Sequence, residues 1–262
     1  MNIKGILLTC FCTFFHFSTS ESTSCGQTII ADNGTITYKL ADNYDAGELC
    51  VFMIKFESGY IDTTFNLDTH GLSNSDSDAV TVFGSFFGLT LAANLGHNQQ
   101  SVTLTGFGAV VIFRTNSSSG TGFQLSFKPN RIRFPGIYDG TYAVFDNNTL
   151  SPLNIPANDT GESLYNYFVF TSGSRLISEP DTFFRLTAKV NFENPDNKCS
   201  NGFHVYSFVD ELQLEKSICE RVDDGVVFEF STRGLFFVYQ DQDGFLPPVS
   251  GVITWETDTL IS

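Results

Sequence analysis

The sequence has few charged residues, and few of those are basic. Asp, Glu, Lys and Arg make up 16% of the 262 residues, and only 14 Lys or Arg stand against 29 Asp or Glu, so the net charge is −15. Coiled coils and long solvated helices carry more charge than this. Because so few bases are available to neutralise phosphates, we expect no nucleic-acid binding and no attraction to anionic membranes. The 28 Phe and the 42% hydrophobic content instead indicate a β-rich interior.

Catalytic motifs are also scarce. The sequence has no His-x-x-x-His pair, Gly-x-Ser-x-Gly elbow, P-loop or dinucleotide-binding fingerprint. Carboxylate pairs such as Asp223 and Asp224 are more typical of turns than of a glycosidase site. We therefore expect a protein that is not an enzyme and that needs no cofactor.

The N-terminus has the pattern of a secretory signal peptide. Lys4 precedes an apolar run over residues 6–17, and small residues follow up to Ser20. The run is shorter than the roughly 20 apolar residues of a spanning helix, and no later stretch reaches that length. We therefore expect residues 1–20 to be cleaved, and the mature chain to be secreted without a membrane span.

The cysteines then predict disulfides. Cys10 and Cys12 leave with the signal peptide, and four cysteines remain, which in an oxidising compartment indicates two disulfides with three possible pairings. Pairing of neighbours would close two short loops, each contributing about 3 kcal/mol to stability. These pairs would be Cys25–Cys50 and Cys199–Cys219.

Asn-X-Ser/Thr sequons are frequent in the loop-like segments. In an exported chain they are predicted glycosylation sites. They are Asn33, Asn116, Asn147 and Asn158.

Alternation of apolar and polar residues predicts two β modules. Residues 61–67 and 184–192 alternate with a period of two, as half-buried strands do. The continuous apolar runs 52–56 and 110–113 predict strands buried on both faces. One weak helix is expected over 209–218, and the two prolines of 128–138 suggest a linker there.

A faint internal repeat supports the division into two modules. Phe65-Asn-Leu-Asp68 matches Val190-Asn-Phe-Glu193, and the segment beginning at Val111 matches the segment beginning at Phe236, both at an offset of 125 residues.

The first module resembles a CUB domain, a two-sheet jelly-roll β-sandwich of secreted and cell-surface proteins. The matching residues are Cys25-Gly26, Leu49-Cys50-Val-Phe-Met-Ile54, Asp78-Ala-Val-Thr-Val-Phe83 and the closing Val111-Ile-Phe-Arg-Thr-Asn with Gly122-Phe-Gln-Leu-Ser-Phe127. Cys25–Cys50 resembles the first CUB disulfide, and Cys199–Cys219 in the second module resembles the second. We therefore expect an all-β chain with two CUB-like jelly-roll β-sandwich modules in tandem, over 21–130 and 131–262.

Some CUB domains bind Ca²⁺ through acidic residues at one end of the sandwich, so the resemblance implies candidate ligands. They are Asp68, Asp78 and Asn116 in the first module and Glu193 and Asp241 in the second. Asn116 replaces the usual Asp, and the second module lacks a middle ligand near residue 202. We therefore expect Ca²⁺ binding to be weak at best, with Kd about 10⁻⁴–10⁻³ M.

These observations favour a secreted, non-enzymatic glycoprotein that binds an extracellular protein or glycan through its loops. Two alternatives remain open, a structural component of an extracellular matrix or coat and a secreted all-β hydrolase.

Overall fold

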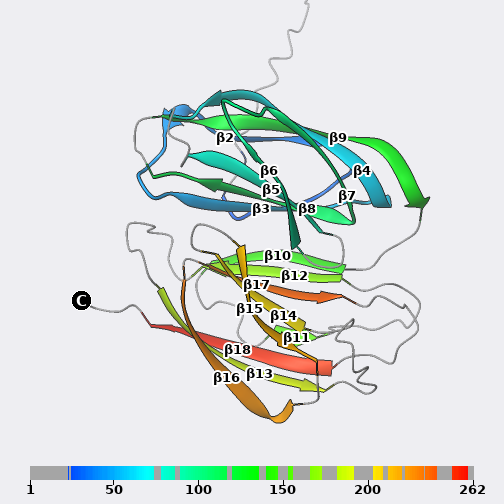
Figure 1. The fold of residues 1–262 in the computed structure, drawn as a ribbon, viewed down its shortest axis with the longest axis vertical. Helices are drawn as coiled ribbons and strands as arrows, with labels where there is room; N and C mark the ends of the chain where they lie inside the picture. The colour runs from blue at the N-terminus through cyan, green and yellow to red at the C-terminus, as the bar shows by residue number, and fades with distance from the viewer. Residues whose placement is uncertain are drawn as a thin grey trace, which may run out of the picture.

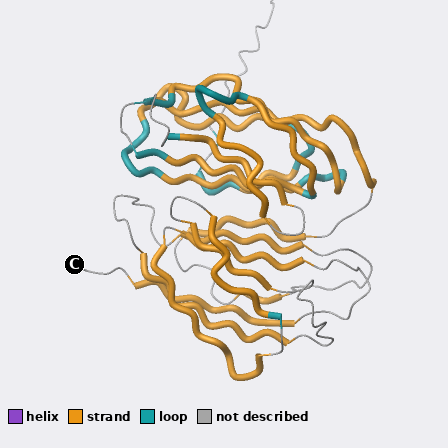
Figure 2. Tube along the Cα trace, in the orientation of Figure 1, coloured by secondary structure: helices purple, strands orange, loops and turns teal. Residues whose placement is uncertain are grey.

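The chain is built of β-strands. The computed structural model describes residues 23, 25–73, 78–85, 89–116, 120–135, 140–146, 153–155, 166–172, 182–191, 203–208, 212–219, 222–232, 234–240 and 250–258. These residues contain 18 strands and no helix (Figure 2). The described part therefore has no helix of the length and hydrophobicity that a membrane crossing requires.

The first half forms a sandwich of two sheets. Sheet A has the order β1-β3-β8-β5-β6, and sheet B has the order β2-β9-β4-β7. Buried aromatic and aliphatic side chains from both sheets make one core, with Phe52, Phe65 and Phe123 among its fully buried members. The strands are β1 (Thr28–Ile30), β2 (Gly34–Asn43), β3 (Leu49–Lys55), β4 (Gly59–Gly71), β5 (Ala79–Ser85), β6 (Leu89–Leu95), β7 (Ser101–Gly106), β8 (Gly108–Arg114) and β9 (Thr121–Pro135).

The second half forms two further sheets. Sheet C has the order β10-β12-β17-β14-β15, and sheet D has the order β11-β18-β13-β16. The strands are β10 (Gly140–Asp146), β11 (Leu153–Ile155), β12 (Asn166–Ser172), β13 (Thr182–Asn191), β14 (Phe203–Phe208), β15 (Leu212–Ile218), β16 (Val222–Thr232), β17 (Gly234–Gln240) and β18 (Ser250–Asp258). The prediction of an all-β chain with two β-sandwiches is confirmed.

The two halves repeat one topology. Adding nine to each strand number of sheets A and B reproduces the strand orders of sheets C and D. Even the parallel pair of β1 with β3 recurs as the parallel pair of β10 with β12. The internal repeat predicted from the sequence is therefore a repeat of the whole strand arrangement.

The predicted register of that repeat differs from the observed register by one residue. The strands β8 and β17 begin at Gly108 and Gly234, an offset of 126 residues, so Val110 and not Val111 corresponds to Phe236. Because neighbouring strand residues point to opposite faces, this shift of one residue moves the side chain to the other side of the sheet. Val110 and Phe236 indeed lie together in one buried cluster, whereas Val111 faces the first core.

Sheet A is covered on both faces. Its inner face packs on sheet B, and its outer face packs on sheet C, so four sheets are stacked (Figure 1). The cluster between sheets A and C is called the inter-sandwich cluster, and its buried members are Leu49, Val51, Met53, Phe83, Val110, Ile112, Phe208 and Phe236. This arrangement explains why β3 and β8 read as continuous apolar runs.

Two local predictions were wrong. The expected helix over 209–218 contains the strand β15 instead, because Leu212 and Leu214 alternate with polar residues and pair with β14. The expected linker over 128–138 is, as far as Pro135, the last part of β9, which pairs with β4 and carries the predicted module boundary at residue 130. Two of the four register shifts in the β4–β9 pair, between Tyr60 and Ile61 and between Asp62 and Thr63, lie in the irregular stretch that contains Pro129 and Pro135.

Candidate functional site

A bend in β2 brings two neighbouring side chains to one carboxylate. The pairing of β2 with β9 is irregular between Tyr38 and Asn43, and Lys39 has a φ of 45°, in the left-handed region. Successive residues of a regular strand point to opposite faces. Here the left-handed residue breaks that alternation, so Tyr38 and Lys39 both reach Glu48.

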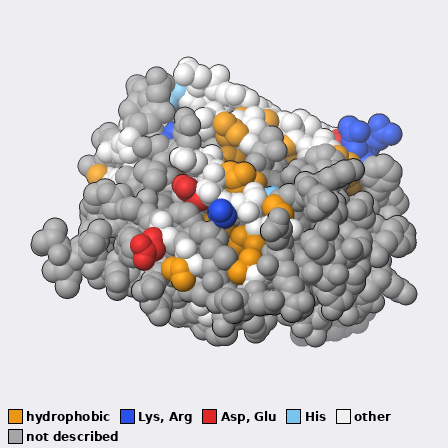
Figure 3. Space-filling view, turned by 60° about the horizontal axis from the view of Figure 1, so that its bottom comes forward, with side chains coloured by type: hydrophobic (Ala, Val, Ile, Leu, Met, Phe, Trp, Pro, Cys, Tyr) orange, Lys and Arg blue, Asp and Glu red, His pale blue; other side chains and the backbone are white. Residues whose placement is uncertain are grey.

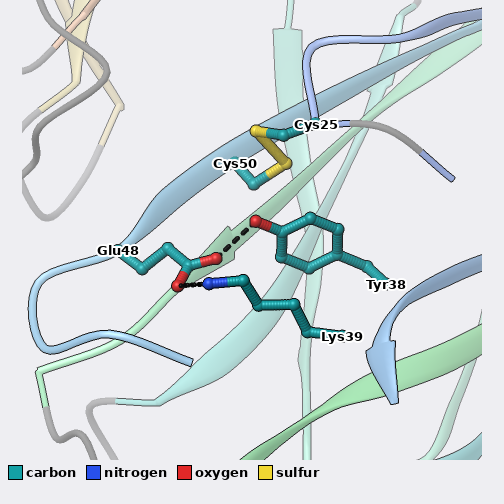
Figure 4. The surroundings of a disulfide bond; sticks show 5 residues. All are labelled: Cys25, Tyr38, Lys39, Glu48 and Cys50. Carbon is teal, nitrogen blue, oxygen red and sulfur yellow. Dashed lines mark hydrogen bonds and ion pairs between the residues drawn. A yellow bond between two sulfur atoms is a disulfide. The ribbon is translucent and has the colours of Figure 1, made fainter. Parts of the chain in front are cut away.

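The carboxylate of Glu48 is buried and receives three hydrogen bonds. The Tyr38 hydroxyl donates to Oε1, and Lys39 Nζ and the backbone N of Asp45 each donate to Oε2 at 2.8 Å (Figure 4). The side chain of Glu48 is 7% exposed, so its ion pair with Lys39 is shielded from water. Burial, together with the hydrogen bond to Glu48, raises the pKa of Tyr38. Burial lowers the pKa of Lys39, but the hydrogen bond and charge of Glu48 outweigh it and raise this pKa overall.

A second buried carboxylate, Asp78, ties three loops together. Its Oδ2 accepts from the Tyr44 hydroxyl at 2.7 Å and from Ser73 Oγ at 2.5 Å. Its Oδ1 accepts from the backbone N of Asn116 at 2.6 Å. These partners belong to the β2–β3, β4–β5 and β8–β9 connections, so Asp78 fixes their relative positions.

Thr115 links the two carboxylate centres. Its hydroxyl donates to the carbonyl of Asp45 at 2.6 Å and accepts from the backbone N of Glu48 at 3.0 Å. Its own backbone N donates to the carbonyl of Glu48 at 3.0 Å. The loops after β2 and β8 are therefore held as one rigid unit.

Close backbone packing at this end depends on glycine. A Cβ at Gly122 would lie 1.8 Å from the carbonyl oxygen of Tyr38, and one at Gly120 would lie 2.4 Å from the carbonyl oxygen of Gly71. Neither atom can move without moving a strand or loop backbone. The two glycines of β9 and its preceding loop thus allow the bend of β2 to lie directly against β9.

Exposed acids surround these fixed loops. Asp42, Asp45 and Asp68 are exposed, and the side chain of Asp45 is 87% accessible. We call this end of the first sandwich the acidic loop end: residues 38–48 with Asp68, Ser73, Asp78, Thr115 and Asn116. It presents negative charge on a backbone that buried hydrogen bonds immobilise.

The predicted Ca²⁺ ligands of the first module are only partly gathered. Asp78 is buried and bonded to protein donors, Asp68 is exposed on β4, and Asn116 contacts Asp78 through its backbone N. Among the described residues there is no group of three or more His, Cys, Asp or Glu that could hold a metal ion. The second set, Glu193 and Asp241, lies outside the described residues.

One predicted disulfide is present. Cys25 and Cys50 are bonded, with a Cα–Cα distance of 5.4 Å, and lie beside the Tyr38–Glu48 contact (Figure 4). Cys219 is disulfide-bonded, and its predicted partner Cys199 lies outside the described residues. Of the four sequons, Asn33 and Asn116 are exposed, and Asn147 and Asn158 lie outside the described residues.

Two histidines meet near the acidic loop end. The rings of His70 and His97 lie 4.6 Å apart, and His97 Nε2 contacts the carbonyl of Leu72 at 2.9 Å. His70 is half-buried at the end of β4. Burial, and next the charge of His97, lower the pKa of His70.

The sequence did not point to Tyr38, Lys39, Tyr44 or Glu48. Some of their partners lie far along the chain, such as Asp78, which is 34 residues from Tyr44, and Thr115, which is 67 residues from Glu48. The left-handed conformation of Lys39 has no signal in its residue type. One signal was present in principle: Glu48 is an acidic residue directly before the buried run of β3.

Comparisons with known proteins give distant structural likenesses. No protein-family model and no curated protein matches the chain. Among solved structures, the CUB1-EGF-CUB2 domain of human MASP-1/3 has a TM-score of 0.32 at 12% identity, covering 87% of this chain and 100% of that chain. The corresponding domains of rat MASP-1 have a TM-score of 0.33 at 11% identity, covering 87% and 99%. The extracellular region of zebrafish Gpr126/Adgrg6 has a TM-score of 0.32 at 11% identity, covering 90% and 37%.

Proposed function

We propose that the protein is a secreted, non-enzymatic glycoprotein that binds an extracellular protein with a basic surface through the acidic loop end. The observation that carries this proposal is the hydrogen bonding of the two buried carboxylates to the surrounding loops. Glu48 and Asp78 each accept three hydrogen bonds from the surrounding loops. Carboxylates engaged in this way hold the loops in fixed positions.

Rigid loops favour binding because less conformational entropy is lost when a partner docks. The exposed acids Asp42, Asp45 and Asp68 would steer a basic partner toward this end, which raises the association rate at low salt. The proposal therefore predicts association that slows as ionic strength rises.

The test starts with capture of partners from extracellular fluid by the immobilised mature glycoprotein. Association rates are then compared for wild type, Asp42→Lys and Asp68→Lys. Glu57→Lys is the matched control, because Glu57 is an equally exposed acid in the loop after β3, at the opposite end of the same sandwich. We expect the two loop-end variants to associate roughly threefold to tenfold more slowly at low salt, and the control to be unchanged.

Three results would contradict the proposal. Equal slowing by Glu57→Lys would mean that only net charge matters. Capture of no protein from any extracellular fluid would favour a matrix or coat component. Turnover of a substrate that Glu48→Gln abolishes would favour the hydrolase.

Calcium has a minor part in this proposal. Asp68, Asp78 and Asn116 offer few free oxygen ligands, since Asp78 already accepts three hydrogen bonds. Titration of Ca²⁺ into the chelator-treated protein should give a Kd no tighter than about 10⁻⁴ M. Micromolar binding that is lost in Asp78→Ala would refute this part.

A further inference from the structure

The last part of β9 forms a basic strip on an acidic protein. Lys128, Arg131 and Arg133 lie within six residues and are all exposed, although the whole chain has only 14 Lys and Arg. Ile132 between them is 50% exposed. In Figure 3 a group of Lys and Arg side chains stands out at the upper right, on the side where β9 ends in Figure 1. We call residues 128–133 the basic strip.

The strip keeps a net positive charge. Arg133 Nε donates to Asp62 Oδ1 at 2.7 Å, so one base is paired. Lys128 and Arg131 have no ion pair at 4 Å or less among the described residues. One acid therefore faces three bases on this part of the surface.

The bases share a face with a row of hydroxyl and amide groups. Lys128 is directly opposite Thr64, and Arg131 is directly opposite Asp62, so their side chains lie on the outer face of sheet B. Arg133 lies there too, through its contact with Asp62.

That face carries cross-strand hydrogen bonds between polar side chains. The hydroxyl oxygens of Thr64 and Thr103 are 2.7 Å apart, and the Ser101 hydroxyl donates to Asn66 Oδ1 at 2.8 Å. Asn130, within the strip, donates to Thr64 at 2.5 Å. These contacts are exposed and leave donors and acceptors for a ligand with many hydroxyl groups.

We propose that the basic strip and the adjoining polar row bind a sulfated polysaccharide. Its sulfates would contact Lys128 and Arg131, and its sugar hydroxyls would meet the Thr, Ser and Asn side chains of β4 and β7. Six strand residues span about 17 Å, which suits a short run of an extended chain lying along the strand. The row of hydroxyls favours a polysaccharide over nucleic acid, whose non-specific binding uses basic grooves with aromatic stacking.

The strip is separate from the acidic loop end. The β9 strand begins at Thr121 beside the acidic loop end and reaches the strip 7 residues later, so the two surfaces lie toward opposite ends of one sandwich. The inference does not depend on the proposed protein partner.

The experiment measures binding of size-defined heparin fragments to the mature glycoprotein at several salt concentrations. With the two cationic contacts of Lys128 and Arg131, raising salt from 0.05 to 0.5 M should weaken binding about 25-fold, by analogy with single-stranded polyanions. We expect Lys128→Glu and Arg131→Glu each to weaken binding at least tenfold at low salt. Lys216→Glu, an exposed base on β15 with the same change of charge, should keep wild-type affinity.

Several outcomes would overturn the proposal. Absence of heparin binding at low salt, equal weakening by Lys216→Glu, or equal binding of desulfated heparin would each refute it. Tighter binding of single-stranded DNA of equal charge would indicate nucleic acid as the ligand. Salt-sensitive dimers in sedimentation that Lys128→Glu abolishes would mean that a second copy occupies the strip. Thermal melting of each variant confirms that it is folded.

Discussion

Replacing Phe236 by Ala should uncouple the two sandwiches. Phe236 is fully buried on β17 and packs in the inter-sandwich cluster against residues of β3, β5 and β8. A Phe→Ala change at such a site lowers the free energy of unfolding by about 3–5 kcal/mol, because it removes apolar contact and leaves a cavity. That loss is a large fraction of the 5–15 kcal/mol typical of a folded domain. Each sandwich has its own sheets, so the first should survive when the second unfolds.

The assay is guanidinium unfolding of the disulfide-intact protein, followed by both fluorescence and circular dichroism. We expect coincident transitions for the wild type and two separate transitions for Phe236→Ala, with the first half unfolding at the higher denaturant concentration. Leu214→Ala is the matched control, since Leu214 is 50% exposed in the same sheet and should change stability by less than about 0.5 kcal/mol. A loss below about 1 kcal/mol for Phe236→Ala, with transitions still coincident, would refute the inter-sandwich contact.

Three further predictions concern the first sandwich. Gly122→Ala should abolish the yield of folded protein, because its Cβ would lie 1.8 Å from a backbone oxygen, whereas Gly84→Ala, whose nearest contact would be 3.7 Å, should fold with a normal yield. Replacing both Cys25 and Cys50 by Ser should lower the unfolding free energy by about 3 kcal/mol, measured by urea denaturation, since the disulfide closes a separation of 25 residues. The pKa of His70 is lowered in the folded state, so the unfolded state binds more protons. The free energy of unfolding should therefore fall as pH drops below about 6.5. In thermal melts, His70→Gln should make this dependence of stability on pH weaker.

The strand pattern and the disulfide could be predicted from the sequence. Residues 61–67 alternate because one face of β4 meets the core and the other meets solvent, and this relation is local. Cys25 and Cys50 could be paired as neighbours along the chain, in agreement with the resemblance. The helix predicted over 209–218 was wrong because a short segment of apolar and charged residues fits the helical period and the strand period equally well. Only its pairing with β14 decides for a strand.

The contacts of the acidic loop end could not be predicted from the sequence. Asp78 stood out as an acid, but its bonds to Tyr44, Ser73 and Asn116 join three connections that only the folded sandwich brings together. The left-handed Lys39 depends on Gly122 of another strand, which leaves room for the bend. Such long-range backbone contacts have no periodic signature.

The sequence by itself determined the β architecture, the presence of two similar halves and the excess of negative charge, because alternation, repetition and composition are properties of the chain. Only the tertiary structure decided what covers β3 and β8. Their continuous apolar runs required a second buried face, and that face is supplied by β14 and β17, which begin between 95 and 185 residues further along the chain. The one-residue correction of the repeat has the same origin: Phe236 faces sheet A because that sheet packs on sheet C, and the sequence of β17 alone does not show this.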